Sequence, residues 1–148
     1  MKTDAQIKLL VTAAIRRHSR DLETWANTRL WEAGEQTRQA ELLARCSLVP
    51  GELPILYSYG DASNWTFVAT RNVWSRDEDQ IGSVAVADVV EEHFGNFKGH
   101  NDQKTERLIL TARDGRVLRC PYETGFPSIG TIYAVQTLLR LRAGTVCP

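Results

Sequence analysis

The chain has 148 residues, of which 43% are hydrophobic and 24% are charged, values typical of an ordinary globular protein rather than a disordered or fibrous one. Its 18 basic and 18 acidic side chains balance, so no net charge favours nucleic acid or anionic lipid as a partner. No apolar run approaches the roughly 20 residues that a membrane-spanning helix needs.

The N-terminus and the cysteines both favour a reduced, cytoplasmic protein. The first 20 residues contain an apolar patch, but Asp4 and Lys8 interrupt it. Arg16 and Arg17 follow without a small-residue cleavage site, which argues against a secretory signal. The three cysteines, at positions 46, 120 and 147, have no CxxC spacing. Reduced thiols are therefore expected rather than a disulfide framework or a structural zinc site.

The first segment, residues 1–47, is predicted to be helical. It has no Gly or Pro between Asp4 and Ala33. Apolar residues recur there at spacings of three and four, at Ile7, Leu10, Val11, Ala14 and Ile15, and again at Leu22, Trp25, Ala26 and Leu30. Polar residues 18–21 weaken the pattern, so the segment is one long helix or two, ended by Gly34. A further short helix is predicted at residues 35–46.

After Pro50 the pattern changes to short β-branched and aromatic runs between turn residues, which is typical of antiparallel strands. The runs are LPILYSY, WTFVAT, VWSR, IGSVAV, DVVEEHF, RLILTA and RVLRCPY. RDG at 113–115 predicts a hairpin between the last two, because Asp and Gly tolerate the backbone of tight turns. The apolar period at 131–144 predicts a terminal helix that ends at Gly144.

The predicted fold class is α+β. A helical N-terminal segment (1–47) would precede an antiparallel β-barrel of about seven strands with a C-terminal helix (48–148). The barrel is expected because seven short strands must curl or close to hide their edges, and a terminal amphipathic helix suits the open end.

The stretch SNWTFVATRNVWSRDED (63–79) mixes tryptophans, arginines and acids. Trp65, Phe67 and Ala69 would share one strand face, which we expect to pack inward because large aromatics dominate small cores. Arg71 and Asn72 would form a tight turn. The following acids would repel phosphate, so base stacking on nucleic acid is not expected here.

Four short sequence segments, in this order along the chain, resemble the bacterial pleckstrin-homology-like domains of the GRAM and YokE-like groups, over about Leu48–Arg142. They are LVPGELPIL (48–56), FVATRNVWS (67–75), SVAVADVVEEH (83–93) and RLILTARDGRVLRC (107–120). The resemblance implies a binding or scaffolding module without catalytic residues. Relatives that grip phosphoinositides use basic residues on the first strands and the loop between them. Here that loop, SYGDASN, has no Lys or Arg, which argues against inositide binding.

Neither metal binding nor cysteine-based catalysis is expected. Glu91, His93, His100 and Asp102 gather in one stretch, but no short-spaced set completes a tetrahedral metal site. Cys120 with His93 could form a nucleophile and base, yet no local motif would lower the thiol pKa. We therefore expect no metal, no cofactor and no enzymatic activity.

The leading hypothesis is a non-enzymatic bacterial protein that binds another protein. Candidate partner-binding residues are Trp25 and Trp31, which would anchor a helix contact, Arg71 at the turn, and Trp74 if it is exposed. One alternative is an immunity or inhibitor protein that binds a toxin. Another is peripheral membrane binding through the Arg-bearing helix. The N-terminal helices also leave homo-oligomerisation open.

Overall fold

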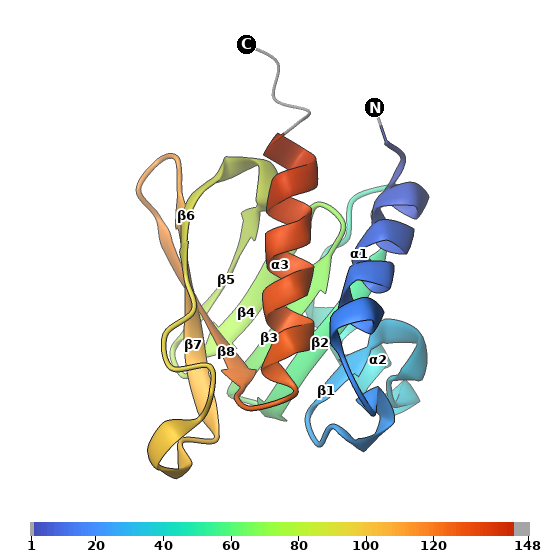
Figure 1. Cartoon of the computed structure of the whole chain (residues 1–148). Helices are drawn as coiled ribbons and strands as arrows, with labels where there is room; N and C mark the ends of the chain where they lie inside the picture. The colour runs from blue at the N-terminus through green and yellow to red at the C-terminus, as the bar shows by residue number, and fades with distance from the viewer. Residues whose placement is uncertain (1, 144–148) are drawn as a thin grey trace.

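The computed structural model describes residues 2–143, and its first element is helix α1 (Asp4–His18). Thr3 caps the helix, because its hydroxyl accepts the Gln6 N–H at 3.2 Å while the Gln6 side chain accepts the Thr3 N–H at 2.9 Å. The buried face of α1 packs against helix α3 (Ser128–Ala143), and the two helices lie side by side (Figure 1).

Residues 22–33, the second part of the stretch predicted as one long helix or two, do not form an α-helix, which corrects the prediction. It contains two 3-10 turns, η1 (Leu22–Thr24) and η2 (Trp31–Ala33), with strand β1 (Thr28–Leu30) between them. β1 pairs antiparallel with β2 (Pro54–Asp61). The pairing of three residues of β1 with the distant strand β2 thus outweighs an apolar spacing that would suit a helix. The short helix predicted next is confirmed as α2 (Gln36–Arg45).

The seven strands predicted after Pro50 are confirmed. They are β2, β3 (Asn64–Ala69), β4 (Asn72–Asp77), β5 (Gln80–Ala85), β6 (Val89–His93), β7 (Thr105–Ala112) and β8 (Val117–Glu123). β1 to β5 form one antiparallel sheet in sequence order, and β6 to β8 form a second. The β3–β4 turn lies at residues 70–71, one position before the prediction, because Asn72 already pairs with Ala85 of β5.

The two sheets do not close into a barrel in the described residues, so that part of the prediction is wrong. β8 crosses the first sheet, and side chains rather than a strand ladder connect them. The Ser75 hydroxyl donates to the Arg119 carbonyl at 2.7 Å. The Gln80 amide donates to the Val117 carbonyl at 2.9 Å and accepts the Arg119 N–H at 2.8 Å. These contacts satisfy backbone groups that a closed ladder would have paired.

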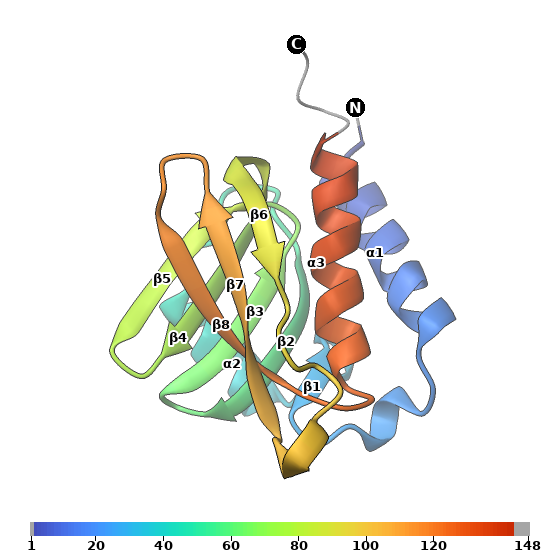
Figure 2. The same ribbon diagram turned by 60° about the vertical axis from the view of Figure 1, so that its left-hand side comes forward.

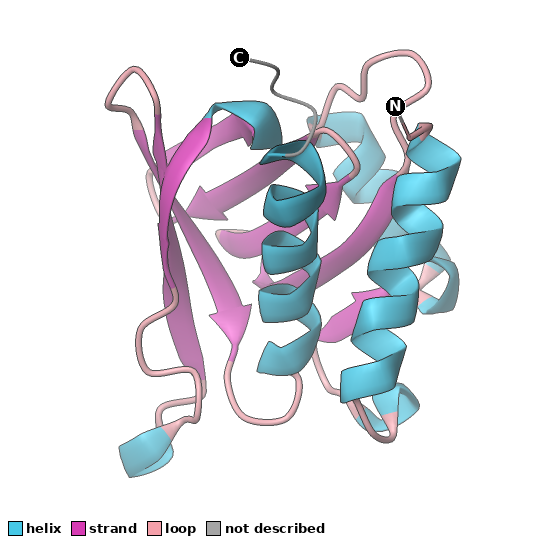
Figure 3. Ribbon diagram, turned by 45° about the horizontal axis from the view of Figure 1, so that its top comes forward, coloured by secondary structure: helices cyan, strands magenta, loops and turns pink. Residues whose placement is uncertain are grey.

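The main apolar cluster lies between the two sheets and the helix pair, which covers the sheets from one side (Figure 3). Its members include Ile7 and Val11 of α1, Leu56 and Val68 of the first sheet, Leu108 and Leu118 of the second, and Leu138 of α3. Trp25 also belongs to it. No helix within residues 2–143 is long and apolar enough to cross a bilayer. The predicted stop at Gly144 lies outside the described residues.

A second apolar cluster lies on the opposite face of the first sheet, beneath α2 (Figure 2). The aromatic face of β3 is buried as expected, but under α2 rather than between the sheets. Trp31 and Trp74 both contact Phe67, with ring centroids 5.3 and 5.5 Å away. The N-terminal segment therefore contributes to both apolar clusters.

Candidate functional site

An apolar groove lies along the outward side of the first turns of α3. Its volume is about 670 Å³, which falls in the range of ligand and side-chain binding sites. Six apolar residues line it: Phe94, Phe97, Phe126, Ile129, Ile132 and Tyr133. Phe126 is 81% exposed and Phe97 is 38% exposed. The groove is therefore a surface where large aromatic side chains face solvent.

The sequence TGFPS fixes Phe126 at the entrance of α3. Gly125 has a φ of +77°, a left-handed conformation that favours glycine, and turns the chain just before Phe126. The hydroxyl of Ser128 donates to the Gly125 carbonyl at 2.6 Å, and its N–H donates to the same oxygen at 3.0 Å. Phe126 is thus held at the tip of a closed turn.

The loop after β6 forms the second wall and carries Phe94 and Phe97. The Gly125 N–H donates to the Phe97 carbonyl at 2.8 Å, which ties this loop to the turn before α3. The hydroxyl of Tyr122, a buried residue of β8, donates to the Phe94 carbonyl. Both phenylalanines of the loop are therefore anchored through their main chain.

Glu106 of β7 fixes the same loop through hydrogen bonds to its carboxylate. Its carboxylate accepts the Asn96 N–H at 2.8 Å and the Gln103 amide at 3.1 Å. Burial raises the pKa of Glu106, but the N–H groups of Arg107 and Asn96 outweigh it and leave the pKa below its ordinary value. A Cβ on Gly95 would lie 2.7 Å from this carboxylate, so the loop passes closely over Glu106.

The third wall comes from the end of α1. The His18 ring stacks on Tyr133 of α3, with centroids 4.1 Å apart and planes 9° from parallel. This contact joins the last turn of α1 to the groove. Three segments that are distant in sequence, at 18, 94–98 and 125–136, therefore build one surface.

The charge of the groove is one-sided. Lys98 is the one side chain with a permanent charge among the described lining residues, and none of them is Asp or Glu. α3 begins inside the groove, and its first turn has no acidic residue. The positive end of the helix dipole is therefore not compensated by a carboxylate of that turn.

None of the four residues predicted to bind a partner lines this groove. Trp25 is 4% exposed and packs in the main cluster, and Trp74 is 9% exposed in the second cluster. Trp31 is partly buried against Phe67. The structure gives these three tryptophans an intramolecular packing role.

Arg71 is exposed at the β3–β4 turn but is engaged within the chain. Its Nη2 atom lies 2.6 Å from Oδ2 of Asp4, and its Nε atom donates to both oxygens of the same carboxylate. The Arg71 guanidinium holds the pKa of Asp4 below its ordinary value. This ion pair ties the hairpin turn to the start of α1.

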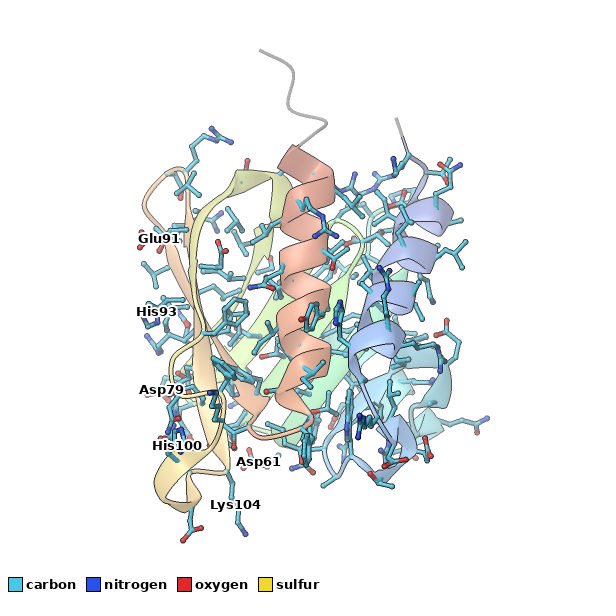
Figure 4. The ribbon with its side chains drawn as sticks, viewed as in Figure 1. Asp61, Asp79, Glu91, His93, His100 and Lys104 are labelled. Atoms are coloured by element: carbon cyan, nitrogen blue, oxygen red, sulfur yellow. The ribbon has the colours of Figure 1, made fainter. Side chains whose placement is uncertain are left out.

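The candidate metal-binding and catalytic residues of the sequence are spread over the surface and core. Figure 4 shows Glu91 and His93 along one side of the molecule, with His100 in the loop below. Within the described residues no group of three or more His, Cys, Asp or Glu could hold a metal ion. Cys120 is fully buried, and burial raises its thiol pKa to about 12, whereas His93 is exposed on β6.

A second cavity, of about 470 Å³, lies where the β2–β3 hairpin meets the ends of β7 and β8. Its lining mixes charges of both signs: Asp61, Glu78, Lys104, Arg107 and Glu123. Glu123 accepts the Thr28 hydroxyl at 2.8 Å and the Asn27 N–H at 3.1 Å, which positions the segment that leads into β1. Glu123 thus serves the fold, and the apolar groove is the stronger candidate site.

The groove was missed by sequence reasoning. Phe97 and Phe126 lie in turn segments, FGNFKG and GFPS, where neither helical nor strand periodicity gives a signal. Apolar aromatic residues inside glycine-rich turns were the available hint, because such turns usually carry polar residues at the surface.

Comparison with known proteins places the chain in no family. No family model, curated protein or solved structure matches it. The candidate site therefore rests on the geometry of this chain alone.

Proposed function

We propose that this protein is a non-enzymatic binding module that docks another protein in the groove at the start of α3. The observation that carries the proposal is the pair of exposed phenylalanines, Phe97 and Phe126, on a frame fixed by main-chain hydrogen bonds. Exposed apolar patches with polar rims mark interaction sites, and aromatic anchors dominate the affinity of protein interfaces.

The layout of the strands supports a pleckstrin-homology-like origin for this module. Seven antiparallel strands, β2 to β8, precede a C-terminal helix that packs on them. In this proposal the chain is an open variant of that fold, because side chains of Ser75 and Gln80 replace the ladder at β8. α2 and β1 are additions, because α2 covers one face of the first sheet and β1 extends that sheet at the edge of β2.

A protein partner is favoured over a membrane surface. The main apolar stripe of α1 is buried, and the large apolar residues of the helix that stay exposed are Leu9 and Leu10, fewer than the six that line the groove. A toxin would be one kind of protein partner, and the immunity or inhibitor role is thus a special case of the same proposal.

Site-specific photo-crosslinking in the native host tests the proposal. A photo-reactive amino acid would replace Phe126, and a control would replace Ile81, which is 63% exposed on β5, away from α3 (Figure 2). Position 126 is expected to capture a defined protein that position 81 does not. Capture of the same proteins from both positions, or of none from 126, would count against the groove as the docking surface.

A further inference from the structure

We propose that the segment bound in the groove is an acidic, amphipathic stretch of the partner, with aromatic or aliphatic side chains next to carboxylates. This inference rests on the proposed function and specifies the chemistry of the partner. The apolar part would contact Phe97, Phe126 and Ile129, and the carboxylates would lie toward Lys98 and the start of α3.

The charges of the groove are the first reason to expect an acidic partner segment. Lys98 is exposed at the rim, and among the described lining residues no carboxylate neutralises it. His18, which stacks on Tyr133, is also exposed and is not an acidic residue. An anionic segment meets no repelling carboxylate in this lining, whereas a basic segment meets Lys98.

The start of α3 adds a second positive feature. The dipole of a helix favours an anion near its N-terminus, although the N–H groups of Ser128, Ile129 and Gly130 already donate to the carbonyls of residues 125–127. The two long helices differ here, since α1 has Asp4 in its first turn whereas the first turn of α3 has no acidic residue. A carboxylate supplied by a partner would meet no competing carboxylate in the first turn of α3.

The shape of the surface favours a polypeptide as the occupant. Phe126, at 81% exposure, stands at the rim rather than inside an enclosed cavity. A small molecule in the groove would leave this ring in water, whereas sites for small molecules bury most of the ligand. A polypeptide segment can cover both the groove and its rim, as in other cases where an amphipathic segment fills an apolar groove.

Selection from a random peptide library displayed on phage, with wild-type protein as bait, tests this inference. Selected peptides would then be titrated against wild type, Phe126→Ser, Lys98→Glu and Lys104→Glu by fluorescence anisotropy. Lys104 is the matched control, because it is exposed and near in sequence but does not line the groove. Thermal unfolding of each variant confirms that it folds.

The expected peptides combine apolar residues with Asp or Glu and lose binding to Phe126→Ser. Lys98→Glu is expected to weaken them about fivefold at low salt, the upper range for one exposed ion pair, and Lys104→Glu to have little effect. Replacing the peptide carboxylates by amides should remove the difference between wild type and Lys98→Glu.

The outcomes separate the two proposals. Peptides that depend on Phe126 but show no acidic preference, or no response to Lys98→Glu, would overturn the acidic partner and leave the docking function standing. No peptide dependent on Phe126 would overturn both. Binding of anionic vesicles, or self-association on size exclusion, that is lost in Phe126→Ser would assign the groove to a lipid surface or to a second copy, and the inference would fail.

Discussion

The N–H of Gly125 donates a 2.8 Å hydrogen bond to the carbonyl of Phe97, and this bond joins the turn before α3 to the loop after β6. Each of these segments contributes one exposed phenylalanine to the groove. Because the main chain of both segments is fixed, a partner would meet an arranged surface and lose less conformational entropy on binding. The groove is in this sense a property of the fold, not of two flexible loops.

The contact between α3 and Trp25 gives the first prediction. A Cβ on Gly130 would lie 2.8 Å from Cζ3 of Trp25 and 3.0 Å from Leu56. Gly130→Ala should therefore destabilise the protein by about 1–2 kcal/mol in urea unfolding, because overpacking outweighs the better helix propensity of alanine. Gln136→Ala, on the exposed side of α3, is the control. A Gly130→Ala variant more stable than wild type would refute the close packing.

The second prediction concerns helix α2, which covers one face of the first sheet. Leu42 is fully buried in the second cluster, whereas Leu43, its neighbour on α2, is 45% exposed. Leu42→Ala should lower the free energy of unfolding by about 2–5 kcal/mol, and Leu43→Ala should change it by less than about 0.5 kcal/mol. Equal effects of the two substitutions would mean that α2 does not pack on the aromatic face.

The third prediction concerns the hydrogen bond of Ser75, which connects the two sheets. The buried hydroxyl of Ser75 donates to the Arg119 carbonyl of β8. Ser75→Ala should cost about 1 kcal/mol in chemical denaturation, because the carbonyl loses a donor that water cannot easily replace. Ser83→Ala, at an exposed position of the adjacent strand, should be neutral. If both variants unfold like wild type, this bridge contributes nothing measurable.

Asp77 gives the fourth prediction, which concerns acid stability. Asp77 is 5% exposed, and its carboxylate accepts hydrogen bonds from Arg119 at 2.7 Å and Arg107 at 3.2 Å. Burial raises the pKa of Asp77, but these two arginines outweigh it and hold the pKa below the ordinary value of 3.8. The unfolded chain therefore takes up the proton first as the pH falls.

Stability from Asp77 should accordingly be complete above about pH 4 and be lost as the pH falls below that value. Asp77→Asn should be less stable than wild type at neutral pH and should show a shallower loss between about pH 4 and pH 2. Urea unfolding across this range measures both slopes. The same slope in both proteins would show that Asp77 does not carry the acid sensitivity.

These features were not equally visible in the sequence. Period-two runs between turn residues predicted β2 to β8, because each strand carries its own pattern. The apolar spacing around Trp25 and Leu30 suggested a helix, since a strand as short as β1 depends on its pairing with β2 and not on local pattern. Barrel closure could not be decided either, because it depends on whether side chains such as Gln80 satisfy the edge of β8.

The groove was the least predictable part. Phe97 and Phe126 have no shared motif, and only the Gly125–Phe97 hydrogen bond and the packing of α3 bring their segments together. The sequence suggested tryptophans as partner-binding residues, but Trp25 and Trp74 are buried and pack inside the protein. Exposure, which decides between a core aromatic and a binding aromatic, is a property of the tertiary structure.

The most direct test of the docking surface compares Phe126→Ser with Ile81→Ser in their affinity for the crosslinked partner. Both substitutions remove a large exposed apolar side chain, at 81% and 63% exposure, so each should leave the stability of the protein nearly unchanged. The groove as docking surface requires Phe126→Ser to weaken binding about tenfold or more in isothermal titration, while Ile81→Ser binds like wild type. Equal affinities of the two variants would contradict it.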